Sequence, residues 1–187
     1  MSYLRGFVPW IVYAALSSFG WQWGALAALI VGVRLLLQDR RAGVAGDALI
    51  LETSTVVYFA ALGVFAFSEP HSALQHYGGV LSFSWLALTA WGTLAIRRPF
   101  TLGIARRTTP QEFWDTPQFL QINTVITTAW ASAFVVSAIA VAGCDAAHAG
   151  TLAATACQVV GFAVPAVFTS RYPRVVQARY AAQGLTS

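Results

Sequence analysis

The sequence predicts an all-α, polytopic membrane protein that forms a single integral membrane domain over residues 1–187. Of the 187 residues, 57% are hydrophobic and only 10% are charged, whereas a soluble domain carries about 25% charged residues. We expect six transmembrane helices arranged as three helical hairpins, with a loop at 97–117. The apolar runs that predict these helices lie at about 4–19, 21–38, 47–68, 78–96, 118–143 and 149–170.

The runs differ in length. The last four reach the roughly 20 residues that a spanning helix needs, whereas the first two are shorter and meet at "FGWQWG". These two either cross as a thin hairpin or form a re-entrant pair; we expect crossing, because non-helical backbone inside a bilayer needs cover by protein. "WIVYAALSSFG" and "TVVYFAALGVF", which open the first two hairpins, are weakly similar, and whether they mark a true repeat stays open.

The basic residues indicate an orientation. All eleven are arginine, and with six crossings they fall on or near one side. The opposite loops, "FGWQWG", "SEPHSALQHYGG" and "GCDAAHAG", contain none. The positive-inside rule therefore predicts that the N- and C-termini are cytoplasmic. Because the arginines form no continuous basic face, nucleic acid is not an expected partner.

The 97–117 loop is the predicted contact surface. Its apolar side chains can lie in the headgroup boundary while its arginines face lipid phosphate, so membrane lipids with anionic headgroups are the expected partners. Other membrane proteins, or a second copy of this chain, are the alternatives. "TPQEFW" predicts a short helical turn, and Thr116-Pro117 predicts the start of the fifth helix. The contact residues that we single out are Arg97, Arg98, Arg106, Arg107 and Trp114.

Ionisable residues inside spanning segments are candidate functional residues, because burying them is costly. Arg34 and Glu52 lie near the cytoplasmic ends of the second and third helices, so the sequence predicts that they pair. A structural ion pair is the expected role. The alternative is a polar pocket of a small transporter or channel, lined by Glu52 together with Thr53, Gln121, Asn123 and Thr127.

The outer side holds the histidines His71, His76 and His148, which are weak candidates for a metal site because their spacing matches no ligand motif. We expect no metal and no other cofactor. No catalytic motif is present, so an enzyme acting on a lipid-borne substrate, with Glu52 or a histidine as acid or base, is only a second alternative. Cys144 is expected in a loop and Cys157 inside a helix, and no disulfide between them is expected.

Several stretches resemble the bacterial intracellular septation protein A family, or a related branch of small inner-membrane proteins. The opening "LRGFVPWIVYAAL" is similar to that family, as is "LALTAWGTLAIRRPFTLGIARRTTPQEFWDTPQFLQINTVITTAWASAF". The resemblance implies a protein of the bacterial inner (plasma) membrane. It also implies a non-enzymatic role in cell-envelope maintenance or division through contacts with other membrane proteins. It carries over no catalytic residues. The matching positions are Thr101, Trp114, Asn123, Trp130, Ala131 and Phe134.

Overall fold

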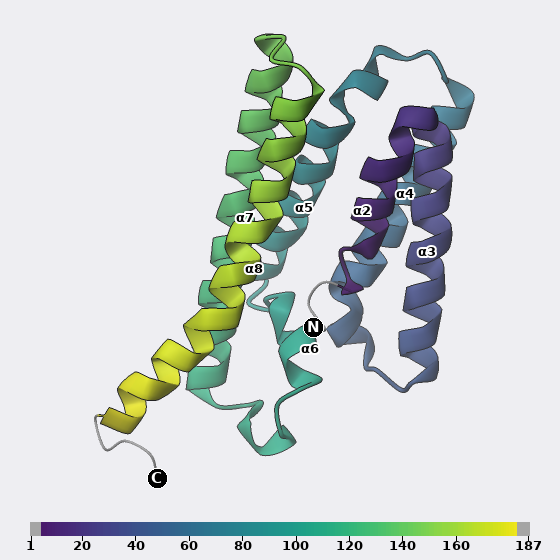
Figure 1. The fold of residues 1–187 in the computed structure, drawn as a ribbon. Helices are drawn as coiled ribbons and strands as arrows, with labels where there is room; N and C mark the ends of the chain where they lie inside the picture. The colour runs from purple at the N-terminus through teal and green to yellow at the C-terminus, as the bar shows by residue number, and fades with distance from the viewer. Residues whose placement is uncertain (1–4, 183–187) are drawn as a thin grey trace.

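The computed structural model describes residues 5–182, and every regular element among them is a helix (Figure 1). The long helices stand side by side and alternate in direction along the chain. In chain order the elements are α2 (Val8–Leu16), η1 (Ser17–Phe19), α3 (Trp21–Arg41), η2 (Gly46–Leu49), α4 (Ile50–Ser68), η3 (Ala73–Tyr77), α5 (Gly78–Ala95), α6 (Thr101–Arg106), η4 (Gln111–Phe113), α7 (Pro117–Ala146) and α8 (Thr151–Ala182).

Local sequence explains several of the helix boundaries. Gly20 joins η1 to α3 with a φ of 131°, a conformation that side-chain-bearing residues rarely adopt. The Thr116 hydroxyl accepts a hydrogen bond from the Phe119 N–H and Pro117 is the first residue of α7, which confirms the predicted helix start.

Other boundaries differ from the predicted ones. The last helix is predicted to end at residue 170, whereas α8 continues to Ala182 and contains Pro165 and Pro173. Figure 1 shows that its lower part leaves the bundle. The polar residues after 170 therefore extend the helix and do not end it. The predicted start of the first helix, residue 4, lies outside the described residues.

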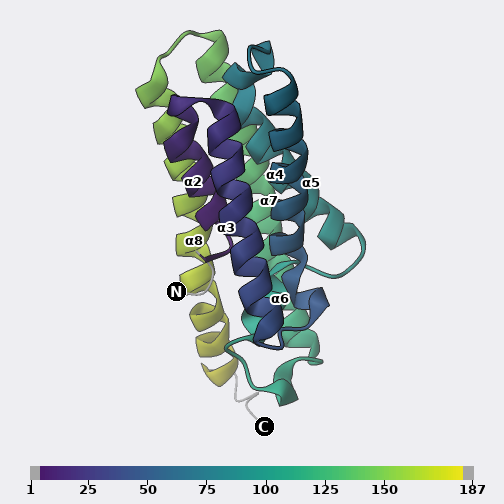
Figure 2. The same ribbon diagram turned by 90° about the vertical axis from the view of Figure 1, so that its right-hand side faces the viewer.

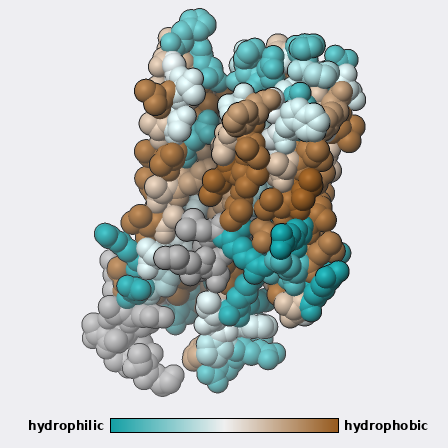
Figure 3. All heavy atoms as spheres, turned by 45° about the vertical axis from the view of Figure 1, so that its right-hand side comes forward, coloured by the Kyte–Doolittle hydropathy of each residue, from teal (hydrophilic) through white to brown (hydrophobic). Residues whose placement is uncertain are grey.

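Five helices in the described part of the chain are long and apolar enough to cross a membrane. The first predicted crossing contains only the apolar helix Val8–Phe19, which rises about 18 Å at 1.5 Å per residue, against a hydrocarbon core of about 30 Å. Six crossings are thus not confirmed, whereas the apolar helices are compatible with a multi-pass membrane protein. Figure 3 shows apolar side chains around the middle of one face and polar ones towards both ends.

The helices form two groups of three. α3 packs closely on both α2 and α4, and α7 packs closely on both α5 and α8, but the backbones of α4 and α5 approach each other little. α4 and α5, which correspond to the second predicted hairpin, are therefore not closely packed along their length. The two groups run in opposite directions, because each contains three helices that alternate along the chain (Figures 1 and 2).

Hydrogen bonds between side chains join α4 to α5 across this opening. The Ser54 and Thr89 hydroxyls lie 2.7 Å apart, and the Trp85 indole N–H donates to Ser54 Oγ at 2.9 Å. The Tyr58 and Ser82 hydroxyls share a longer bond of 3.2 Å. These polar contacts keep the two groups in a fixed relation on one side of the molecule.

The 97–117 segment contains a helix that the sequence did not predict. α6 packs its Gly103 against the backbone of Ala48 so closely that an added Cβ would overlap it. Phe100 and Ile104, which we expected in the headgroup region, are buried in the core. The first half of this segment is therefore part of the packed bundle and ties η2 to α7.

Candidate functional site

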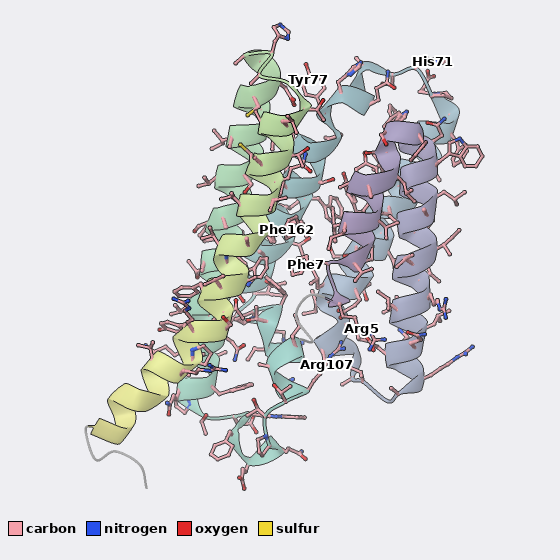
Figure 4. All side chains as sticks on the ribbon, viewed as in Figure 1. Arg5, Phe7, His71, Tyr77, Arg107 and Phe162 are labelled. Atoms are coloured by element: carbon pink, nitrogen blue, oxygen red, sulfur yellow. The ribbon has the colours of Figure 1, made fainter. Side chains whose placement is uncertain are left out.

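Four charged side chains form a cluster near one end of the molecule. We call this end the arginine end, because α3 ends there in two arginines and the arginines that follow α5 also lie there. Arg107, just after α6, donates from Nη1 to Asp39 Oδ2 at 3.2 Å and from Nη2 to Glu52 Oε1 at 3.0 Å. Arg5 Nη1 lies 3.2 Å from Asp39 Oδ1, and its Nη2 donates to Gln38 Oε1 at 3.0 Å. The cluster joins α3, α4, α6 and the segment before α2; Figure 4 labels its two arginines.

Burial makes this ion-pair cluster important for stability. The side chains of Asp39 and Glu52 are only 6% and 8% exposed, and that of Arg107 is 19% exposed. Two arginines balance two carboxylates, so the cluster carries no net formal charge. Glu52 is packed shut between its neighbours, which favours the structural role over the open polar pocket.

The predicted pairing is corrected in one partner. Glu52 lies in a buried ion pair, but its partner is Arg107, whereas Arg34 is exposed on α3. Arg107 was expected to face lipid phosphate. It points into the protein instead, because it pairs with Asp39 and Glu52. Asp39 was missed, although an acid in the last turn of a helix opposes the helix dipole and needs a basic partner.

The other predicted pocket residues do not come together. Thr53 and Gln121 are exposed, whereas Asn123 and Thr127 are buried on α7. The Thr101 hydroxyl donates to the Asn123 carbonyl oxygen at 3.0 Å and shares a bond of 2.8 Å with the Thr127 hydroxyl. These buried polar groups fasten α6 to α7, a connection between helices that needs no ligand.

The remaining predicted contact residues do meet at the surface. A hollow of about 500 Å³ lies among Arg97, Arg98, Arg106 and Trp114, and Asp115 also lines it. The Arg106 guanidinium stands 5.2 Å from the centre of the Trp114 ring, within the range of a cation–π interaction. The hollow offers cationic groups beside an amphipathic ring, an arrangement that suits the headgroup region.

A much larger cleft separates the two helix groups at the opposite end. Its volume is about 1570 Å³, above the roughly 300–1,000 Å³ of ordinary small-molecule sites. It lies between α2 on one side and α5, α7 and α8 on the other. Sequence reasoning missed the cleft, because it depends on how far apart the two groups stand.

Aromatic rings form the inner end of this cleft. Phe7 stacks on Trp130 with ring centres 4.8 Å apart, and the Phe162 ring lies 5.3 Å from both Phe7 and Phe83. Figure 4 labels Phe7, the residue just before α2, close to Phe162 of α8. None of the four residues of the ion-pair cluster lines the cleft, and these rings lie at its inner end.

Polar side chains gather at the outer mouth of the cleft. Ser17 of η1, His76 of η3 and His148 and Asp145 near the end of α7 all line it. His71 lies in the turn before η3 and does not line it. No three potential metal ligands come together among the described residues. His76 and His148 are part of the polar rim of the cleft.

One of the two cysteines differs from expectation, whereas Cys157 lies inside a helix, α8, as predicted. Cys144 lies in the last turn of α7 and not in a loop, and its Sγ is 3.7 Å from that of Cys157 in α8. In this structure no bond joins the two sulfur atoms.

Comparisons with models of protein families, with curated proteins and with solved structures found no match for this chain.

Proposed function

We propose that this chain is a non-enzymatic, multi-pass membrane protein that binds an amphipathic, lipid-like molecule in the cleft between its two helix groups. The observation that supports this most directly is the distribution of side chains in the cleft. Serine, histidine and aspartate side chains lie at its mouth, and phenylalanine rings line its inner end. A polar headgroup fits the first environment and an acyl or prenyl chain the second.

The cleft also has a route to the bilayer. Ile11 of α2 and Val159 of α8 line it and are 57% and 61% exposed. On this proposal the gap between these two side chains is the lateral entrance to the cleft. A molecule already dissolved in the bilayer can enter there without passing through water, which favours a lipid over a water-soluble ligand.

The orientation is part of the proposal. The ends of α3, α5 and α8 that carry or lead into arginines lie together at one end of the bundle (Figure 1), whereas η1 and η3, which line the cleft mouth, lie at the other end. The positive-inside rule then places the arginine end in the cytoplasm of a bacterial cell and the cleft mouth outside. The hollow around Arg97, Arg98 and Arg106 would contact anionic headgroups of the inner leaflet, at about 1 kcal/mol per arginine.

Native mass spectrometry of the protein released from mild detergent tests the binding. We expect a co-purifying lipid that survives delipidation in the wild type. Ala14→Trp places an indole in the cleft and should abolish this retention. Ala15→Trp is the matched control, because Ala15 is the exposed neighbour on α2 that does not line the cleft. Equal lipid retention in both variants would refute the cleft as the binding site.

Transport of the bound molecule is a second candidate function. The observation that favours it is the pair of three-helix groups that run in opposite directions, an arrangement common in transporters. On this proposal the aromatic packing and the ion pairs close the cleft towards the arginine end, and they can rearrange without unfolding a helix. A vesicle assay with fluorescent lipids of different headgroups would show transfer between leaflets if transport occurs.

A role in envelope maintenance or division, as in the septation protein A family, is a further part of the proposal. It rests on the matching sequence stretches alone. Complementation of a septation-defective strain tests it, and no rescue by the wild-type chain would count against it.

A further inference from the structure

We infer that Cys144 and Cys157 form a disulfide in the protein as it sits in its membrane. They are the only two cysteines of the 187 residues, yet the fold brings their sulfur atoms to 3.7 Å. Cys144 lies in the last turn of α7 and Cys157 in the second turn of α8. The hairpin register alone juxtaposes two thiols that stand thirteen positions apart in the chain.

The geometry needs little change for the bond to form. A disulfide has an S–S distance of about 2.05 Å, so the two sulfurs must approach by about 1.7 Å. Rotation about the Cα–Cβ bonds moves a sulfur by this much. The surroundings allow such rotation, because both thiols are only half-buried.

The location supplies the conditions for oxidation. Cys144 lines the cleft mouth, so it can be reached from that end of the molecule. In the orientation proposed above, on which this inference rests, the mouth faces the oxidising extracytoplasmic side, where disulfides form and persist. The oxidant is a disulfide-bearing donor, either a protein or a small molecule.

The reaction is two successive thiol–disulfide exchanges. The Cys144 thiolate attacks one sulfur of the donor disulfide, forms a mixed disulfide and releases one donor thiol. The Cys157 thiolate then attacks Cys144 Sγ, forms the intramolecular bond and releases the second donor thiol. The two protons lost from the cysteines are taken up by the two donor thiolates, and the donor is reduced as the pair is oxidised.

The bond would hold the outer ends of α7 and α8 together at the mouth of the cleft. Closing a loop of this length raises the melting temperature by about 6–12 °C in a protein of this size. The proposed disulfide is thus a covalent restraint on one wall of the cleft, and reduction would loosen that wall.

Maleimide trapping in intact cells, followed by intact mass measurement of the full-length chain, tests the inference. We expect no adduct on the wild type without reductant and two adducts after reduction with a phosphine. Cys144→Ser and Cys157→Ser should each carry one adduct under both conditions. Cys144→Ser combined with Gly143→Cys moves one thiol around the helix, and this control should take two adducts without reductant.

Two adducts on the unreduced wild type would overturn the inference. Treating the purified protein with oxidised glutathione then identifies the step that failed. Closure in the purified protein but not in cells would show that the orientation is wrong, and no closure in either would show that the helix register is wrong. Lipid retention by the Ala14 and Ala15 variants is measured separately, so failure of the cleft proposal is distinguishable from failure of the disulfide.

Discussion

Replacing Arg107 by methionine should destabilise the protein far more than replacing an exposed arginine outside the ion-pair cluster. The change removes the ion pairs at 3.2 Å to Asp39 and at 3.0 Å to Glu52. Asp39 keeps its contact with Arg5, but Glu52 keeps no other ion-pair partner among the described residues. The main cost is therefore one buried carboxylate without its counter-charge.

The magnitude follows from the burial of the pair. Breaking a buried ion pair by removing one partner costs roughly 3–5 kcal/mol. Because the Arg107 side chain is 19% exposed and water can partly replace it, the lower end applies, about 3 kcal/mol. For a chain of this length that lowers the melting temperature by about 6–12 °C.

Thermal unfolding in detergent measures this effect. Arg98→Met is the matched control, because it makes the same change of charge at an exposed site; it should stay within about 0.5 kcal/mol of the wild type. Arg34→Met should behave like that control. Combining Arg107→Met with Glu52→Leu should recover most of the loss, because no unpaired buried charge is then left in the pair. Equal melting temperatures for Arg107→Met and Arg98→Met would refute the buried cluster.

Two further substitutions probe packing, each read as the melting temperature beside its own control. Gly103→Ala forces a methyl group into the Ala48 backbone and should cost about 1–3 kcal/mol of stability. Gly92→Ala is its control, because the added methyl group meets open space, and it should be neutral or stabilising. Equal melting temperatures for the two variants would refute the close packing of Gly103 on Ala48. Phe7→Ala removes the ring that stacks on Trp130 of α7 at the inner end of the cleft and should cost about 3–5 kcal/mol. Phe19, which is 81% exposed, is its control, and Phe19→Ala should cost little. Equal losses of stability would contradict the aromatic packing at the inner end of the cleft.

Sequence reasoning succeeded where the signal is local. A threonine followed by proline defines a helix start by itself, because the hydroxyl caps the helix and the ring suits its first turn. Thr116 and Pro117 therefore lie where they were predicted. Long apolar runs predict long helices for an equally local reason, since hydropathy is a property of each segment alone.

It failed where one segment depends on another. Residues 97–117 were predicted to be a surface loop, because nothing in their own composition shows that Gly103 packs on Ala48. That contact forms α6 against the bundle and directs Arg107 to Asp39 and Glu52, so the partner of Glu52 could not be predicted. The meeting of the two cysteines likewise depends on the register of a helical hairpin, which apolar sequences specify weakly.

One missed residue did have a signal. Asp39 stands in the last turn of α3, between glutamine and arginine, where a negative charge is unfavourable near the negative end of the helix dipole. An acid in such a place is expected to have a basic partner from another segment. Pairing it with an arginine of the 97–117 segment would have placed that segment beside α3.

The most direct test of the central claim is to locate the bound molecule with a photoactivatable lipid. The protein is reconstituted in bilayers that contain a lipid with a diazirine near the end of its chain, irradiated, and mapped by peptide mass spectrometry. We expect labelling at the inner end of the cleft, on peptides that carry Phe83 and Phe162. The Ala14→Trp protein should lose that labelling. Labelling confined to outward-facing positions such as Val64 and Ile139, and unchanged in Ala14→Trp, would contradict it.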